Sequence, residues 1–300
     1  MEIHGLHILL TYQCTFECDH CFVWGSPWQP GVFTIQKLRQ VFEQARELDT
    51  LEWIYFEGGE PFLYHGLLQQ AVEEASALGY RVGIVSNAYW ATSVEDAELY
   101  LRPLAGLVQE LSVSSDLFHY SEMISQQSRN ATLAAENLGI PVGTISIASP
   151  EIDEAQYTSG ILPEGETGVM YRGRAAQKLA SRANHQDWHV FTTCPYEDLR
   201  DPGRLHLDPY GHLHICQGIT LGNLFETPLK EILINYDPDR HPIVGPLLAG
   251  GPAELARRYE VIPEATYADA CHLCDQSRQY LRIRFPSVLA PDQMYAVLEN

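Results

Sequence analysis

The segment ILLTYQCTFECDHC, residues 8–21, joins a run of strand-forming residues to three closely spaced cysteines. Residues 8–12 are rich in β-formers and predict a strand. Cys14, Cys18 and Cys21 lie in the loop that leaves it. Thiolates suit zinc and iron–sulfur clusters. Three of them on one loop leave one corner of a four-iron cluster open to a cofactor or substrate, whereas a zinc site would borrow a fourth ligand such as His20.

Strand-like and helix-like runs alternate from this segment to about residue 175. Apolar residues at helical spacing predict helices over 34–48 and 65–78, and further helices are expected near 93–103 and 120–138. Thr34 is the expected N-cap of the first helix. Short apolar runs predict strands over 53–56, 81–85, 110–114 and 142–147. This repetition predicts an α/β fold with a parallel sheet, either open or closed into a barrel.

The pattern changes after about residue 180. Turn-forming residues separate two short alternating runs, 205–207 and 212–215, which predicts a β-hairpin. A short helix near 227–235, a Pro/Gly-rich stretch over 238–252 and a helical pattern follow. We expect one domain over residues 1–185 and a small cysteine-bearing domain with a helical tail over residues 186–300.

Charge and apolar patterning exclude several functions. The 300 residues carry 19 basic and 39 acidic side chains, a net charge of −20, and show no cationic run. Binding to nucleic acid or to an anionic membrane surface is therefore not expected. We expect neither a membrane span nor a signal peptide, because no apolar run approaches the required length and the N-terminus lacks a basic region. Seven clustered cysteines favour metal sites in a reducing cytoplasm over disulfides.

The cysteine triplet after a first strand resembles the signature of the radical S-adenosylmethionine (SAM) superfamily, and three later segments support the resemblance in order. The stretch 56–61, FEGGEP, is similar to that family's glycine-rich turn, and Ser-Asn at 86–87 and SVSSD at 112–116 follow the next strands. Taken alone, each is also an ordinary turn or helix cap. The positions that the resemblance assigns to cofactor binding are Cys14, Cys18, Cys21, Phe16, His20, Gly58, Gly59, Glu60, Pro61, Ser86, Asn87, Ser114 and Asp116.

The resemblance covers roughly the first 175 residues and implies a partial (β/α)6 barrel. It also implies a [4Fe-4S] cluster on Cys14, Cys18 and Cys21 that binds SAM through its open iron and reduces it, which yields a 5′-deoxyadenosyl radical. Arg172 and Arg174 resemble a basic turn near the end of the barrel. Contact with SAM and a surface ion pair both remain open for them.

Four further cysteines, Cys194, Cys216, Cys271 and Cys274, are enough to surround a second metal. A zinc-ribbon-like site would use them equally well. The stretch 208–216, DPYGHLHIC, resembles the auxiliary-cluster domains called SPASM and twitch. Because residues 275–300 contain no cysteine, the resemblance favours the shorter twitch form with one auxiliary [4Fe-4S] cluster.

The domain pairing resembles enzymes that modify ribosomally made peptides. We expect an oxidative modification, either dehydrogenation or C–C or C–S bond formation, because no unassigned cysteine is left to return a hydrogen atom. A dehydrogenase of a small molecule such as an aminocyclitol is the alternative, and a non-catalytic zinc-binding scaffold is the remote one. An electron donor such as a flavodoxin or ferredoxin is implied, and a peptide leader would need a separate partner or a direct groove. The sequence does not identify a catalytic side chain.

Overall fold

The computed structural model describes residues 1–122, 124–150, 166–261 and 263–297, which fall into two compact units. The N-terminal unit comprises His4–Cys18 and Gly25–Val169. The C-terminal unit comprises Met1–Ile3, Asp19–Trp24 and Met170–Asn300. The predicted boundary at residue 185 stays a prediction.

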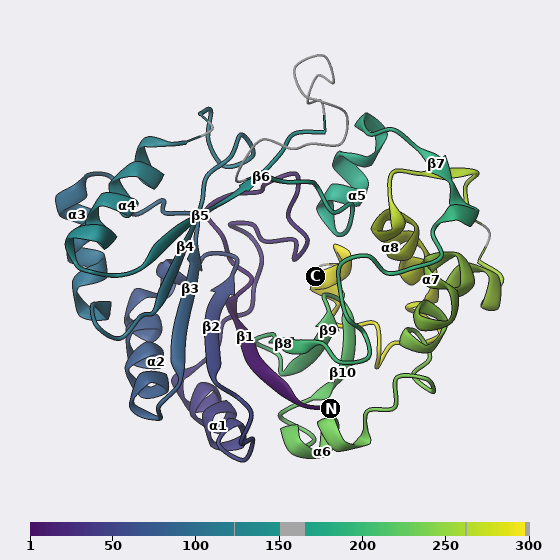
Figure 1. Ribbon diagram of the computed structural model, residues 1–300, viewed down its shortest axis with the longest axis horizontal. Coiled ribbons are helices and arrows are strands. Elements are labelled where there is room, and N and C mark those ends of the chain that lie inside the picture. The colour runs from purple at the N-terminus through teal and green to yellow at the C-terminus, as the bar shows by residue number, and fades with distance from the viewer. Residues whose placement is uncertain (123, 151–165, 262, 298–300) are drawn as a thin grey trace. The chain divides into compact units, whose positions relative to one another are not determined.

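The N-terminal unit is built on parallel strands that neighbour one another in sequence order, β1 to β6. The strands are β1 (Ile3–Thr11), β2 (Trp53–Gly58), β3 (Arg81–Ser86), β4 (Glu110–Ser114), β5 (Val142–Ile147) and β6 (Glu166–Thr167). The helices between them are α1 (Ile35–Ala45), α2 (His65–Ala77), α3 (Val94–Leu101) and α4 (Gln126–Asn137). Figure 1 shows these helices on one side of the strands. The α/β fold with a parallel sheet is confirmed.

Local sequence explains these elements. The Thr34 hydroxyl accepts a hydrogen bond from the Lys37 amide at 3.3 Å, so the predicted N-cap of α1 is confirmed. Along β2, Ile54 and Phe56 are fully buried while Trp53 and Tyr55 are only half-buried. This alternation gives the sheet an apolar face toward the helices and a second face of more polar, aromatic character.

The C-terminal unit contains a small antiparallel meander. Its strands are β8 (Gly203–Leu207), β9 (His212–Cys216) and β10 (Ile219–Asn223). The predicted hairpin is thus confirmed and extended by one strand. The other elements are α5 (Arg174–Lys178), β7 (Gln186–Asp187), α6 (Leu229–Asn235), α7 (Val244–Arg258), β11 (Thr266–Tyr267) and α8 (Ala270–Leu281).

Helix α7 begins at Val244, inside the Pro/Gly-rich stretch 238–252 and so earlier than the helical pattern expected after it. The helix is interrupted at Gly250 and Gly251, whose backbone angles are not helical, and Pro252 follows directly. Pro is tolerated in the first turn of a helix, so this proline restarts the helix after the break.

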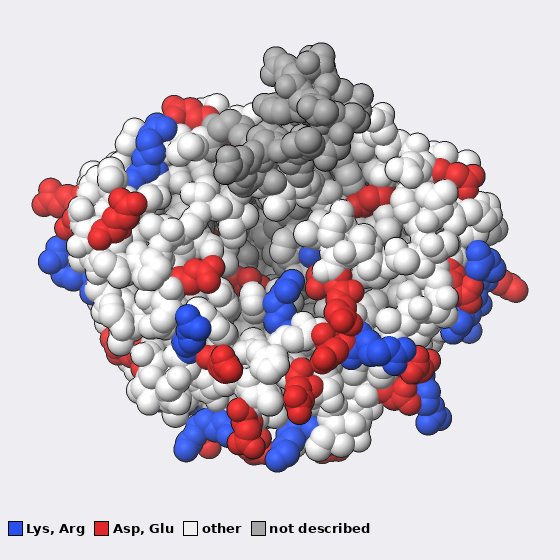
Figure 2. Space-filling model, in the orientation of Figure 1, with Lys and Arg blue, Asp and Glu red and all other residues white. Residues whose placement is uncertain are grey.

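The described part of the chain contains no helix that is both long and apolar enough to cross a membrane. On the face drawn in Figure 2, basic and acidic side chains are interspersed.

Candidate functional site

The glycine-rich turn after β2 lies against the backbone that leads into the first cysteine. The Gly59 amide donates to the Thr11 carbonyl at 2.7 Å, and the Glu60 amide donates to the Gln13 carbonyl at 2.8 Å. A Cβ atom on Gly59 would lie 2.1 Å from the Gln13 oxygen. Gly58 has φ +137°, and a Cβ there would lie 2.4 Å from the Thr11 oxygen. The two glycines are therefore required for close packing against the backbone from Thr11 to Gln13, which leads into Cys14.

Glu60 is fully buried and joins this turn to the end of β3. Its Oε1 accepts hydrogen bonds from the Ser86 hydroxyl at 2.9 Å and the Phe62 amide at 3.0 Å, and its Oε2 accepts one from the Asn87 amide at 2.8 Å. Burial raises the pKa of the Glu60 carboxyl to about 7, and these hydrogen bonds oppose the shift. Pro61 is buried and begins the short 3₁₀ turn that follows.

Asn87 reaches the first cysteine. Its Nδ2 donates to the Cys14 sulfur at 3.5 Å and to the Thr15 hydroxyl at 3.1 Å, while its own carbonyl accepts from the Tyr120 hydroxyl at 2.9 Å. The Tyr120 ring packs edge-on against Phe16, with centroids 5.2 Å apart. Sequence reasoning missed Tyr120, because nothing in the local sequence connects it to the cysteine loop.

Asp116 is buried at the end of the fourth strand's segment. Its Oδ1 lies 2.8 Å from the His119 Nδ1, and its Oδ2 accepts from the Ile147 amide at 3.3 Å. The His119 ring packs edge-on against Phe16 at 5.9 Å. Ser114 is half-exposed at the end of β4. Within the N-terminal unit, the structure thus brings the Cys14 loop, the Glu60 turn and the Asn87 turn together.

Cys21, the last cysteine of the triplet, belongs to the C-terminal unit, whereas Cys14 and Cys18 belong to the N-terminal unit. His20 and Cys21 are half-buried, and the Cys21 carbonyl accepts a hydrogen bond from the Arg174 amide at 2.9 Å. Cys18, in the N-terminal unit, is 8% exposed. The liganding and cofactor roles of these residues stay predictions.

The C-terminal unit brings its four distant cysteines to one pocket. Cys194 lies in the loop before β8, Cys216 ends β9, and Cys271 and Cys274 lie on the first turns of α8. Asp269 caps this helix by accepting from the His272 amide at 2.7 Å, and the helical spacing then places the last two cysteines on one face. The pocket is lined by Arg172, Cys194, Pro195, Tyr196, Glu197, Leu199, Cys216, Ile219, Leu247, Pro252, Ala270, Cys271, Cys274 and Arg278.

The chemistry of this pocket fits a metal centre. None of the four cysteines forms a disulfide. Burial raises the pKa of the Cys274 thiol to about 12, and it also raises the pKa of Cys194 and of Cys271. Four half-buried cysteines that line one pocket can ionise together only if a cation compensates them, which is what a metal or an iron–sulfur cluster supplies.

Two arginines complete the pocket. Arg172 is 6% exposed and donates from Nη1 to the Cys216 sulfur at 3.2 Å, so it is not a surface residue. Arg278 is 2% exposed. Sequence reasoning left the role of Arg172 open and missed Arg278, although the spacing of four residues from Cys274 on one helix was a usable signal.

Comparisons with known proteins show what this chain is similar to. Residues 8–116 match the model of the radical SAM superfamily. The YydG protein of Bacillus subtilis (strain 168), whose name assigns it provisionally to peptide biosynthesis, is 27% identical over 124 residues; the match spans 41% of this chain and 39% of YydG. The solved structure of native anSMEcpe with bound AdoMet and Cp18Cys peptide has a TM-score of 0.54 at 11% identity, over 95% of this chain and 97% of that chain. Streptococcus suis SuiB bound to precursor peptide SuiA has a TM-score of 0.45 at 11% identity, over 90% of this chain and 76% of that chain.

Proposed function

We propose that this radical SAM protein, whose residues 8–116 carry the match to the superfamily, is an iron–sulfur enzyme that reductively cleaves SAM and uses the radical to modify a peptide oxidatively. The observation that carries the proposal is the packing of Gly59, Glu60 and Asn87 around the Cys14 loop. A cysteine triplet alone would serve zinc, but a zinc site needs no such convergence of strand ends.

The proposed cofactors are SAM and two four-iron clusters. Cys14, Cys18 and Cys21 would hold the first cluster, and Cys194, Cys216, Cys271 and Cys274 would hold the second. When bound, the first cluster supplies the electron that cleaves SAM to methionine and a 5′-deoxyadenosyl radical, which abstracts a hydrogen atom from substrate. The ends of β2 to β4 would hold SAM, as is usual for ligands of parallel α/β folds.

The chain's own residues would orient the cofactor and its cluster. Glu60 joins the turn after β2 to the turn after β3, which keeps the distance between the two turns constant. Asn87 holds the Cys14 sulfur through its side-chain amide and thereby orients that ligand. A second cluster with four cysteine ligands has no open corner, which favours a role as electron acceptor from the substrate radical.

A peptide is the proposed substrate class because the partial match is to a protein named for peptide biosynthesis. The chain's fold is also that of a protein solved with a bound peptide. The test is hydrogen exchange of the reconstituted enzyme with SAM, with and without each short peptide that the neighbouring genes are found to encode. Protection of backbone amides supports a peptide substrate. No change with any such peptide would favour the small-molecule alternative.

The first experiment measures iron, sulfide and zinc after anaerobic purification and reconstitution. About eight irons and eight sulfides per chain are expected, the content of two four-iron clusters. The Cys18→Ala variant should no longer form 5′-deoxyadenosine from SAM under a strong reductant. Glu17→Gln, an exposed neighbour in the same loop, is the matched control and should retain that reaction. Zinc with almost no iron would overturn the enzyme proposal.

A further inference from the structure

Arg172 places its charged group in the pocket of the second cysteine set. Its Nη1 donates to the Cys216 sulfur at 3.2 Å and lies 3.3 Å from the Glu197 Oε1. Arginine remains protonated even when buried, so this contact brings a full positive charge to a sulfur. A hydrogen bond from a charged donor to a thiolate is also stronger than one from a neutral donor.

The backbone around Arg172 is held tightly, which directs the side chain. The Gly173 amide donates to the Asp275 carboxylate at 3.0 Å. Gly173 has φ +60°, and a Cβ atom there would lie 2.6 Å from the Phe22 Cα. The Arg172 guanidinium lies 4.8 Å from the centre of the Phe22 ring. The hydrogen bond to Asp275 and the close approach of Gly173 to Phe22 thus fix the segment, and the ring contact sets the guanidinium between an aromatic face and the cysteine pocket.

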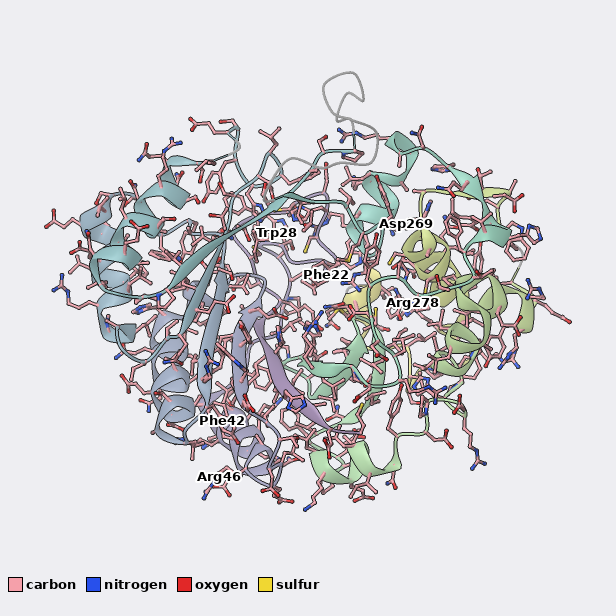
Figure 3. All side chains as sticks on the ribbon, viewed as in Figure 1. Phe22, Trp28, Phe42, Arg46, Asp269 and Arg278 are labelled. Atoms are coloured by element: carbon pink, nitrogen blue, oxygen red, sulfur yellow. The ribbon has the colours of Figure 1, made fainter. Side chains whose placement is uncertain are left out.

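The other charges around the pocket have different partners. The Arg278 Nη1 donates to the Gln217 carbonyl at 2.8 Å, and its Nη2 lies 3.6 Å from the Asp275 Oδ1. Glu197 is shared, because its Oε2 also lies 3.6 Å from the Arg204 Nη2. Arg278 lies on α8 and Asp269 is the N-cap of that helix, and both side chains are labelled in Figure 3. Among these charged groups of the described chain, Arg172 is the one whose guanidinium donates a hydrogen bond to a sulfur of the pocket.

We propose that Arg172 is a positioning residue of the second centre that orients Cys216 and raises the potential at which an iron–sulfur cluster there accepts an electron. This inference rests on the proposed function. Net charge and hydrogen bonds to the sulfurs are among the factors that set the potential of such clusters. Uptake of one electron adds one negative charge to the centre, and a fixed guanidinium beside a ligand sulfur stabilises the reduced state more than the oxidised one.

The test isolates the second centre in the full chain. A background variant in which Cys14, Cys18 and Cys21 are all alanine should retain about four irons, the content of one cluster. In that background, Arg172→Gln, Arg172→Lys and Arg174→Gln are compared with their parent by iron content and by a redox titration monitored by electron paramagnetic resonance. Arg174 is the matched control: it is also 6% exposed and on the same segment, but its guanidinium lies over Trp24 at 5.4 Å and outside the pocket lining.

We expect Arg172→Gln to lower the midpoint potential, Arg172→Lys to lower it less, and Arg174→Gln to leave it at the parent value. If Arg172→Gln loses its iron, the Arg172→Lys variant distinguishes the two explanations. Iron retained in Arg172→Lys supports the role of the positive charge, and loss of iron from both variants overturns that role. A parent with four irons and equal potentials in all variants overturns the inference alone. A background protein that holds zinc or no iron overturns the second cluster of the proposed function, and the inference with it.

Discussion

The Glu60 carboxylate accepts a hydrogen bond from the Asn87 amide at 2.8 Å, and this bond joins the turn after β2 to the turn after β3. With the bonds from Ser86 and Phe62, three of the roughly four acceptor positions of this carboxylate are directed at the protein itself. The resemblance assigns Glu60 to the cofactor. The structure adds that Glu60 holds together the two turns between which the cofactor is proposed to bind.

Glu60→Gln should therefore weaken both stability and SAM binding. A glutamine amide offers one oxygen, so its NH₂ group would face a backbone donor, and losing one such buried bond costs about 1–3 kcal/mol. We expect a lower thermal midpoint and a weaker SAM affinity, measured by calorimetry on the reconstituted protein. Glu57→Gln is the control from the same strand, since Glu57 pairs with His7 at a part-exposed position. Unchanged SAM affinity in Glu60→Gln would contradict the positioning role.

Glu60 also predicts a pH dependence. Its pKa is raised from 4.5 to about 7 in the folded protein, so between these values the folded state binds more protons than the unfolded state. The stabilisation is present below the unfolded pKa and is lost as the pH rises through 7, by an amount on the order of 1–3 kcal/mol. The parent should thus lose thermal stability relative to Glu60→Gln between pH 5.5 and about 7.5. A constant difference between the two midpoints across this window would show that Glu60 does not titrate there.

Gly59→Ala should disrupt the first cysteine site. The new Cβ would lie 2.1 Å from the Gln13 carbonyl oxygen, a backbone atom that can move only with the Cys14 loop. We expect loss of iron from the first site, or of the folded protein, measured by iron content and circular dichroism. Gly66→Ala is the matched control in α2, where a Cβ meets nothing within 4 Å and should be neutral or stabilising by about 0.5–1 kcal/mol. Equal iron content in the two variants would contradict this account of Gly59.

Asn87→Asp tests the contact with the first cysteine. The substitution replaces the amide that donates to the Cys14 sulfur at 3.5 Å with a carboxylate, which repels a thiolate. We expect a lower potential or lower iron content at this site, read by iron analysis and a redox titration of a chain that retains Cys14, Cys18 and Cys21. Asn235→Asp adds the same charge at an exposed position at the end of α6 and should change neither quantity. If Asn87→Asp matches Asn235→Asp, the contact does not support the cluster.

Much of the fold follows from local patterns. The capping Thr34, the apolar periodicity of α1 and the strand alternation of β2 depend on residues a few positions apart, so these elements can be predicted from sequence. Helix α7 could not, because its glycines and Pro252 indicate a loop by composition. The tertiary structure overrides this preference by burying Val244, Leu247 and Leu255 on one helix.

The sequence alone determines the spacing of the cysteine triplet and the order of the turns after the strands. Each is a short-range feature whose chemistry depends on neighbouring residues. The meeting of Cys194 with Cys271, the contact between Arg172 and Cys216, and the bonds of Glu60 to Ser86 and Asn87 join positions far apart in sequence. Periodicity and motif spacing carry no information on such pairs. Only burial in a folded unit decides which distant polar groups must share a hydrogen bond or a charge.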